Sequence, residues 1–335
     1  MARRRRVLRA ATVLLSLAAA AMAMEVALRF WGAPYYRFNN RSMEYYTNPR
    51  GYHSPLREEG RYTIYGLEYR ATEEGYRLPD APARARPDGQ ALILGLGDSF
   101  LFGRGVRYAD LYATRLGDAL RHEGCGTGVR NCGVVGHDLP QILDTYRKEA
   151  SKKRYPLVLY GFTLNDFGLP AKVFGSDLID INNGGNVFDR LRSASKLYDL
   201  IRRSLDKLRL HRVVIEAYHQ AFRGEDAAAK FEMFRRLRRE VEAREGALVV
   251  VLFPLLYDLR HYPFQDIHEK LAAFCEKEGI PLLDLLPAFS RYEAEELWAN
   301  PTDHHPNETA HGIAARELHD FLVKNALVPR DCAGP

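Results

Sequence analysis

The stretch from Ala91 to Gly105 constrains the fold of this chain more than any other. It begins with an apolar run, Ala91 to Leu96, which is typical of a strand buried on both faces in a parallel sheet. The run stops at Gly97-Asp98-Ser99, and a turn rich in glycine follows. Open α/β sheets place their reactive groups outside the carboxyl ends of the strands. Ser99 is therefore a candidate reactive residue, but a polar residue after a strand is more often structural, so other loops have to support it.

The chain after residue 91 alternates strand and helix patterns. Further strands are predicted at 129–135, 157–162, 247–253 and 281–286, and helices at 110–122, 140–153, 267–278 and 307–324. This alternation predicts a mostly parallel sheet with helices on both faces. A helical insertion is expected at about 171–246, with helical stretches at 191–210 and 227–244. The second stretch is strongly charged, which favours a solvated helix face over a surface for a partner or an anionic glycan.

Residues 1–32 form a membrane anchor or signal segment. Arg3 to Arg6 precede an uncharged run from Ala10 to Met24, which falls short of the roughly 20 residues of a full span. A helix from Val7 to Trp31 is long enough, and the apolar pattern continues that far. We therefore predict an uncleaved anchor in the inner membrane, with the remainder in the periplasm or outside. A signal peptide cleaved after Ala21-Met22-Ala23, which leaves a soluble exported protein, is the alternative.

Residues 33–90 are rich in Tyr, Arg, Gly and Pro and show no sustained period, so we predict an extended linker there. The exported domain is expected to span 91–328. The net charge of +5 comes mostly from the arginines at the N-terminus, which leaves no electrostatic footprint for nucleic acid. Of the four cysteines, Cys125 and Cys132 flank a Gly-rich loop and are spaced for a small disulfide. Cys275 and Cys332 can pair only if the C-terminal tail folds back, and no CxxC motif supports a zinc ribbon.

Four polar loops follow strands and therefore share one edge of the predicted sheet. They contain Asp98-Ser99, Asn131 to Gly136, Asn165-Asp166, and Asp303 to Asn307. This set supplies what acyl transfer needs. A serine nucleophile requires a base such as an imidazole, and the imidazole requires a carboxylate to orient it. The oxyanion requires donors, here the backbone N–H groups of Ser99 and Gly136 and the side-chain amide of Asn165.

Ser99, Gly136, Asn165 and His305 together resemble the four blocks of the SGNH (GDSL-like) hydrolase superfamily, over residues 91–324. The blocks are Gly97-Asp98-Ser99, Asn131-x-Gly133-x-x-Gly136, Asn165-Asp166 and Asp303-x-His305-Pro306-Asn307. The resemblance implies a three-layer α/β/α sandwich around a five-stranded, parallel, flavodoxin-like sheet. The layout also resembles an exported bacterial branch whose anchor ends in a Glu-x-x-x-Arg-like stretch, here Glu25 and Arg29.

The last block departs from the pattern of many members. These place the acid three residues before the histidine, where this chain has Thr302. Asp303 lies two residues before His305, as in the Asp-x-His of some relatives, including polysaccharide O-acetyltransferases. We therefore predict that Asp303 is the acid and His305 the base, with His304 as a competitor for the second role.

Other kinds of site have less support. Asp303, His304, His305 and His311 could bind a metal, but no matching group of ligands accompanies the serine. Gly95-x-Gly97 begins like a dinucleotide loop, but Phe100 takes the place of the third glycine. The Gly-x-Ser-x-Gly elbow and the Walker A loop are absent. We expect Asp98 and Asp166 to make loop hydrogen bonds.

The sequence thus predicts a membrane-anchored serine esterase with Ser99, Asp303 and His305 as its catalytic residues and with no cofactor. Its substrate is expected to be an O-acetyl or other O-acyl ester of an envelope carbohydrate or lipid. The same acyl-enzyme would serve a polysaccharide O-acyltransferase, and a catalytically silent SGNH-like subunit that binds within an envelope assembly is the non-enzymatic alternative. The sequence does not identify protein partners.

Overall fold

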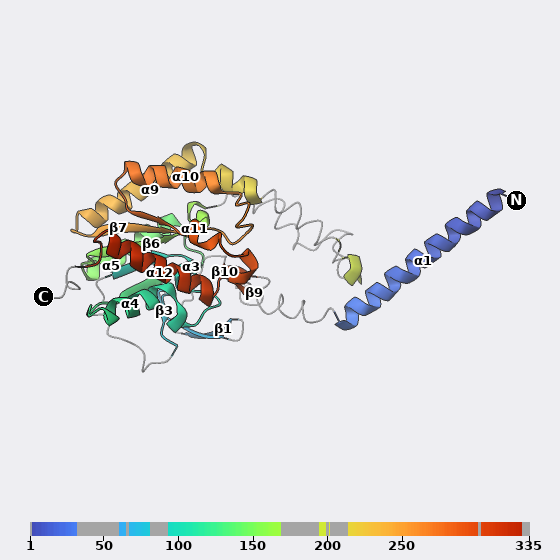
Figure 1. The fold of residues 1–335 in the computed structure, drawn as a ribbon, viewed down its shortest axis with the longest axis horizontal. Coiled ribbons are helices and arrows are strands. Elements are labelled where there is room, and N and C mark those ends of the chain that lie inside the picture. Colours follow the sequence, from blue (N-terminus) through green and yellow to red (C-terminus); the bar gives the residue numbers. More distant parts are fainter. Residues whose placement is uncertain are drawn as a thin grey trace. The chain divides into compact units, whose positions relative to one another are not determined.

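The computed structural model describes residues 2–31, 60–64, 67–80, 93–168, 194–198, 201, 214–300 and 303–329 (Figure 1). The chain divides into two compact units, each described by itself. The first comprises Met1–Pro49 and Pro170–Ala217, and the second comprises Arg50–Leu169 and Tyr218–Pro335.

The first unit contains one long helix, α1 (Ala2–Trp31). Its segment Arg4–Phe30 is 27 residues long, with a mean hydropathy of 1.9. At 1.5 Å per residue this segment is about 40 Å long, enough to cross the roughly 30 Å hydrocarbon core of a bilayer. Apolar side chains such as Leu14, Leu17 and Phe30 are exposed along it. Length and composition fit a membrane anchor, and a signal sequence has the same properties.

The second unit is built on a five-stranded parallel sheet. Its strands are β4 (Ile93–Gly97), β5 (Val129–Gly133), β6 (Leu157–Phe162), β7 (Ala247–Leu252) and β8 (Leu282–Asp284). Their order is β5-β4-β6-β7-β8, and each neighbouring pair is parallel. This is the flavodoxin-like order, with a topological switch point between β4 and β6. The predicted fold class is confirmed.

Helices cover both faces of this sheet. Helices α4 (Tyr112–His122) and α12 (Glu308–Lys324) pack together on one face, and α9 (Gly224–Glu242) and α10 (Gln265–Lys277) lie on the other (Figure 1). Helix α5 (Leu139–Lys152) packs beside α9.

Part of the segment that was predicted as an insertion, 171–246, belongs to the α/β/α sandwich itself. Helix α9 packs on α5 and β7 and belongs to the second unit, whereas the first unit takes the chain only as far as Ala217. A parallel β6–β7 pair requires a crossover between its strands, and α9 lies in that crossover. Its arginines pair with glutamates, as in the Arg238–Glu242 and Arg236–Glu240 bridges of 2.8 Å and 3.1 Å, which fits a solvated helix face.

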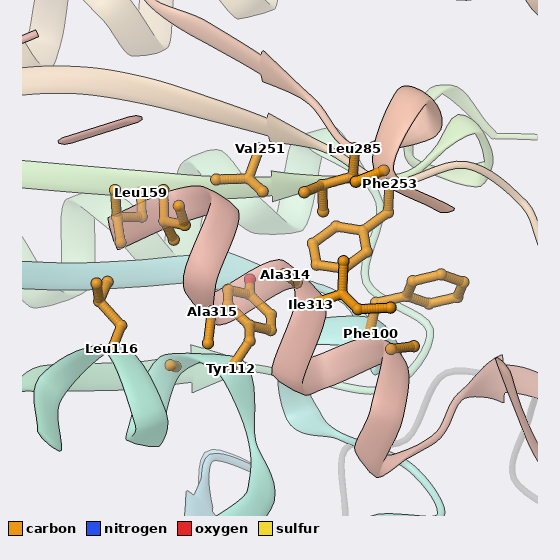
Figure 2. Close-up of a cluster of buried hydrophobic side chains, with 14 of the residues drawn as sticks. Phe100, Tyr112, Leu116, Leu159, Val251, Phe253, Leu285, Ile313, Ala314 and Ala315 are labelled. Carbon is orange, nitrogen blue, oxygen red and sulfur yellow. The ribbon is translucent and has the colours of Figure 1, made fainter. Parts of the chain in front are cut away.

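One core cluster fills the space between the sheet and the α4–α12 layer. Figure 2 shows Phe100 and Phe253 near the strand ends, with Ile313 of α12 beside them and Tyr112 of α4 further along. The rings of Phe100 and Phe253 meet edge to face at 5.7 Å. Because Phe100 directly follows Ser99, this packing fixes the backbone of the Gly97-Asp98-Ser99 turn to the core.

The segment predicted as an extended linker contains a small antiparallel sheet. Its strands are β1 (Gly60–Ile64), β2 (Leu67–Ala71) and β3 (Arg77–Leu78). The Tyr69 hydroxyl accepts a hydrogen bond from the Gly105 N–H at 2.7 Å, and the guanidinium of buried Arg77 lies 3.9 Å from the Tyr69 ring centroid. Arg77 also donates to the carbonyl of Val106 at 3.2 Å. The strands are too short to show a period in the sequence, yet they hold the loop that follows Ser99.

Short elements complete the second unit. They are α3 (Ser99–Phe102), η3 (Tyr108–Asp110), η4 (Leu164–Phe167), α11 (Leu286–Phe289), η5 (Ala294–Leu297), β9 (Trp298–Asn300) and β10 (Asp303–Pro306). Cys125 and Cys132 are both buried thiols, so the disulfide considered from the sequence does not form between them. Cys275 is also a buried thiol, and Cys332 lies outside the described residues.

Candidate active site

Ser99 is the first residue of the short helix α3, directly after β4. Asp98 caps this helix, because its Oδ1 accepts the Phe100 N–H at 2.9 Å. The Ser99 side chain lies at the carboxyl edge of the sheet, where the residue is 7 % exposed. A strand end and a capped turn therefore hold the hydroxyl in one place.

His305 is the residue that meets this hydroxyl. Its Nε2 lies 2.8 Å from Ser99 Oγ, although the two residues are 206 positions apart in the chain. His305 belongs to β10, which pairs with β9 in a hairpin outside the main sheet. Its ring also lies 5.5 Å from that of Phe100. An imidazole at this distance can accept the serine proton, which is the arrangement needed for a nucleophile and its base.

His304, the competing base, lies among aromatic rings. Its ring stacks on Trp298 with 3.8 Å between centroids and an interplanar angle of 11°, and Tyr257 meets it edge to face at 5.8 Å. Trp298 Nε1 donates to the Leu256 carbonyl at 2.8 Å. These contacts join the hairpin that carries His305 to the loop that follows β7.

The start of α12 fixes the chain that directly follows His305. Asn307 caps this helix, because its Oδ1 accepts the N–H groups of Thr309 and Ala310 at 3.0 Å. Its Nδ2 donates to the carbonyl of Glu296 at 2.8 Å. The backbone is therefore held immediately after His305-Pro306. Asp303 is the first residue of β10, and its side chain lies outside the described residues.

The segment from Asn131 to Gly136 supports the turn at Ser99 from the neighbouring strand. Asn131 Nδ2 donates to the carbonyl of Leu101 at 2.8 Å, and Asn131 Oδ1 accepts the Gly133 N–H at 2.9 Å. A Cβ atom on Gly133 would lie 2.5 Å from the Phe102 nitrogen, so only glycine allows α3 to approach β5 this closely. Gly136 follows in the loop after β5 with φ of 80°, a conformation that favours glycine, and the space beside it is open.

Asn165 belongs to a buried group of polar side chains after β6. Its Nδ2 donates to Asp98 Oδ2 at 3.0 Å, and its Oδ1 faces the hydroxyl of Thr163 in a short hydrogen bond. Asp166 Oδ2 accepts the Thr163 N–H at 3.1 Å. Asp98, Thr163 and Asp166 are all completely buried. The structure thus joins the turn at Ser99 to Asn165 through Asp98.

The Asp166 carboxyl is electrostatically unusual. Removal from water raises its pKa well above the ordinary value, and the nearby charge of Asp98 raises it further. Tyr160, also buried in this region, has a raised pKa for the same main reason. Both effects favour the protonated form of the Asp166 carboxyl.

A second polar chain fixes the loop after β7. His268 of α10 is 1 % exposed; its Nδ1 lies 3.0 Å from the Asp284 carboxylate and its Nε2 lies 3.2 Å from the Tyr262 hydroxyl. That hydroxyl accepts the Leu255 N–H at 2.9 Å. Tyr262 therefore holds the backbone of this loop, beside the residues that contact the β9–β10 hairpin.

His311, which the sequence offered as a metal ligand, has a different role. It is completely buried, its Nδ1 accepts the Tyr112 N–H at 3.1 Å, and its ring stacks on the Tyr112 ring. Burial lowers the pKa of His311 to about 3, so it is neutral in the folded protein. No group of three or more potential metal ligands occurs in the described part of the chain.

Sequence reasoning missed Thr163, Trp298 and Tyr257. A signal for Thr163 was present, because Thr163 and Asp166 have the spacing of a capping box directly after a buried strand, and the structure forms that box. The roles of Trp298 and Tyr257 depend on contacts between separate loops, which no local pattern encodes.

The fold can be compared with those of known proteins. No protein-family model matches the chain, and no curated protein matches it. Solved structures do match. The psychrotrophic esterase EstA from Pseudoalteromonas sp. has a TM-score of 0.44 and 14% identity, and 70% of this chain and 98% of that chain are covered.

Two further matches have similar values. The acetyl xylan esterase AlAXEase has a TM-score of 0.43 and 13% identity, over 68% of this chain and 96% of its own. A member of the lipolytic protein G-D-S-L family from Veillonella parvula has a TM-score of 0.40 and 13% identity, over 69% of this chain and 98% of its own. The matched folds are those of G-D-S-L lipolytic proteins and esterases.

Proposed function

We propose that this protein is a serine esterase that acts through an acyl-serine intermediate. The observation that carries the proposal is the 2.8 Å approach of His305 Nε2 to Ser99 Oγ at the carboxyl edge of the sheet. For Nε2 to accept the serine proton, the imidazole must carry its own proton on Nδ1. Asp303, two residues earlier in the same strand, is the proposed carboxylate that holds this tautomer.

The proposed reaction has two halves. Ser99 Oγ attacks the ester carbonyl while its proton passes to His305 Nε2; the alcohol then leaves with that proton, and the acyl group remains on Ser99. Water attacks the acyl-serine, gives a proton to His305, and releases the acid as the proton returns to Ser99 Oγ. The Ser99 N–H, the Gly136 N–H and one N–H of Asn165 are the proposed oxyanion donors.

The proposed substrate is an O-acyl ester of an envelope carbohydrate or lipid. Support comes from α1, which is long and apolar enough to anchor the chain to a membrane. The positive cluster at the start of α1 favours a cytoplasmic N-terminus, with the catalytic unit on the opposite side. A sugar hydroxyl in place of water would give O-acyl transfer from the same intermediate.

Labelling with a fluorophosphonate probe tests the proposal. Wild-type protein should be labelled at Ser99, and Ser99→Ala should not be labelled. Ser151→Ala is a matched control, because Ser151 is an exposed serine on α5 and should leave labelling unchanged. A folded wild-type protein that resists the probe would instead support a binding subunit. Release of acetate from an acetyl donor, measured with and without oligosaccharide, separates the two enzymes: release that is unaffected by sugar counts against transfer.

A further inference from the structure

The Thr163 hydroxyl faces more acceptors than it can serve. Its Oγ1 lies 3.1 Å from Asp98 Oδ2 and 3.2 Å from Asp166 Oδ1, and it makes the short contact with Asn165 Oδ1. A hydroxyl has one hydrogen to donate, and an amide oxygen and an ionised carboxylate only accept. If both carboxyl groups were ionised, only one of these three oxygens could receive a hydrogen from Thr163.

One additional proton supplies the hydrogen that is missing from the hydrogen bonds in this group of side chains. Placed on Asp166 Oδ1, it is donated to Thr163 Oγ1, and Thr163 then donates to Asn165 Oδ1. Asn165 Nδ2 in turn donates to Asp98 Oδ2 at 3.0 Å. Since Asp98 Oδ1 already accepts the Phe100 N–H, each of these bonds has a donor and an acceptor, and the 3.1 Å approach of Thr163 Oγ1 to Asp98 Oδ2 is then a contact without a hydrogen. The remaining hydrogen on Asn165 Nδ2 is then free to point into the site.

We propose that Asp98, Thr163 and Asp166 are positioning residues for the oxyanion donor, and that a proton kept on Asp166 fixes the orientation of the Asn165 amide. This inference rests on the proposed esterase function. An Asn amide can turn by 180°, and in the turned state its oxygen would face Asp98. The donated bonds from Asp166 through Thr163 select the productive orientation, with nitrogen toward Asp98 and toward the oxyanion.

Burial and charge support the required protonation state. Asp166 is completely buried, and both its desolvation and the charge of Asp98 raise its pKa. Asp98, by contrast, receives hydrogen bonds from Asn165 and from the Phe100 backbone, which suit an ionised carboxylate. The two carboxyl groups therefore have different partners and, in this proposal, different protonation states.

Two matched pairs of variants test the proposal, with p-nitrophenyl acetate as the substrate. Asp166→Asn keeps an N–H donor toward Thr163, whereas Asp166→Ala removes it. Thr163→Ser keeps the hydroxyl, whereas Thr163→Val removes it at nearly constant shape. We expect the first member of each pair to retain kcat within about threefold and the second to lose about 10- to 100-fold in kcat, with KM nearly unchanged.

A double-mutant cycle separates positioning from a purely structural role. If Asp166 and Thr163 act through Asn165, their effect on kcat should nearly vanish once Asn165 is replaced. Adding Asp166→Ala or Thr163→Val to Asn165→Ala should then lower kcat by less than about threefold. Equal kcat for Asp166→Asn and Asp166→Ala, or fully additive losses with Asn165→Ala, would overturn the proposal. If Asp166→Ala does not fold by circular dichroism, the Thr163 pair decides alone. Fluorophosphonate labelling of wild-type Ser99 is measured separately. A failure of the proposed esterase function can therefore be distinguished from a failure of the positioning proposal.

A second inference comes from the first unit, near the end of α1. The Glu25 carboxylate accepts the Lys196 N–H at 3.0 Å, the Leu197 N–H at 2.8 Å and the Ser195 hydroxyl at 2.9 Å. Arg29, one turn further along α1, bonds Glu25 at 2.8 Å and donates to the Ala194 carbonyl at 2.7 Å. Both carboxylate oxygens are thus satisfied, as a charge near the end of a membrane helix requires.

We infer that Glu25 and Arg29 dock residues 194–198 onto the end of α1, and that α1 is therefore kept in the mature protein. A cut after Ala23 would leave Glu25 in the first turn of a helix that begins at Met24, where the backbone frays. The docking geometry depends on a continuous helix through both residues, because the Glu25–Arg29 bond joins positions i and i+4.

Hydrogen exchange on the full chain in detergent micelles tests this docking. We expect the amides of Lys196 and Leu197 to be protected in the wild type and to exchange at least tenfold faster in Glu25→Ala. Thr12→Ala, a change elsewhere on α1, is the control and should leave them protected. Equal exchange in wild type and Glu25→Ala would contradict the docking, and a mature protein that begins at Met24 would contradict the retention of α1.

Discussion

The two halves of the candidate site are held by different physical means. The nucleophile half consists of Asp98, Ser99, Thr163, Asn165 and Asp166, on turns after the adjacent strands β4 and β6. Its side chains are joined by hydrogen bonds, and three of them are completely buried.

The histidine half consists of Trp298, His304, His305 and Asn307, on and around a hairpin outside the main sheet. It is held by the Trp298–His304 stack and by the cap of α12. Buried hydrogen bonds fix directions but depend on where each proton lies, whereas stacking tolerates small rotations and depends on contact area. We therefore expect coupled, pH-sensitive losses in the nucleophile half and simpler packing losses in the histidine half.

The largest expected effect is the loss of the proposed base. His305→Ala should lower kcat by about 10⁴ or more, because nothing then accepts the Ser99 proton. His304→Ala is the comparison variant: it removes the stack on Trp298 but not the base, and it should lower kcat by only about tenfold. Steady-state rates with p-nitrophenyl acetate measure both, and equal losses would mean that the base is misassigned.

Loss of the amide donor should come next. Asn165→Ala should reduce kcat by about 10²–10³, with KM little changed, because an oxyanion donor acts mainly in the transition state. Asn131→Ala removes an amide that instead bonds the Leu101 carbonyl, and it should act more through thermal stability than through kcat. A near-normal kcat for Asn165→Ala would remove this residue from the oxyanion hole.

Substitutions in the histidine half that leave His305 in place should lower kcat less than the loss of Asn165. Trp298→Ala removes the stack on His304 and the bond to the Leu256 carbonyl, and should reduce kcat by about tenfold through a less well-placed His305. Trp298→Phe keeps a ring but loses the N–H, and should lie within about threefold of the wild type. If Trp298→Ala has a normal kcat, stacking does not hold this half in place.

Asp166 should make the protein less stable as pH rises. Its pKa is raised in the folded state by burial and by Asp98, with Tyr160, Tyr112 and Tyr218 as the nearby titratable groups. Above the ordinary Asp pKa the folded state therefore binds more protons than the unfolded state, so the free energy of unfolding falls toward the raised pKa. Thermal melts from about pH 5 to about pH 8 should show a smaller decline for Asp166→Asn than for the wild type. If the melting temperatures of the wild type and of Asp166→Asn declined in parallel, the pH dependence would not come from a proton on Asp166.

His311 should produce the smallest effect, with the opposite sign. Its pKa is lowered to about 3 by burial, so the unfolded state binds more protons below the ordinary His pKa of about 6.5. Stability should therefore be lost as pH falls from about 6.5 toward 3. His311→Asn can keep an acceptor for the Tyr112 N–H without titrating, and its melting temperature should fall less between about pH 7 and about pH 5. An unchanged slope would contradict this assignment.

The sequence by itself determined the sheet and the order of its polar loops. Buried strands in a parallel sheet are continuous apolar runs, and each ends where a polar or glycine residue follows, so local patterns were sufficient. The predicted strand at 157–162 coincides with β6, and the helix predicted at 307–324 differs from α12 only at its first residue. Ser99, Asn165 and His305 were predicted as site residues because each lies in a short motif after a strand or before a helix.

Only the tertiary structure decided how those residues meet. It selected His305 over His304 for contact with Ser99, because the hairpin stacks one ring on Trp298 and turns the other toward α3. It also placed Asp98 and Asp166 around Thr163. The contact between Asp98 and Thr163 joins residues 65 positions apart, and it depends on the register of β4 beside β6. Local patterns predict where a strand ends, but the partners of a buried side chain are set by the packing of strands distant in sequence.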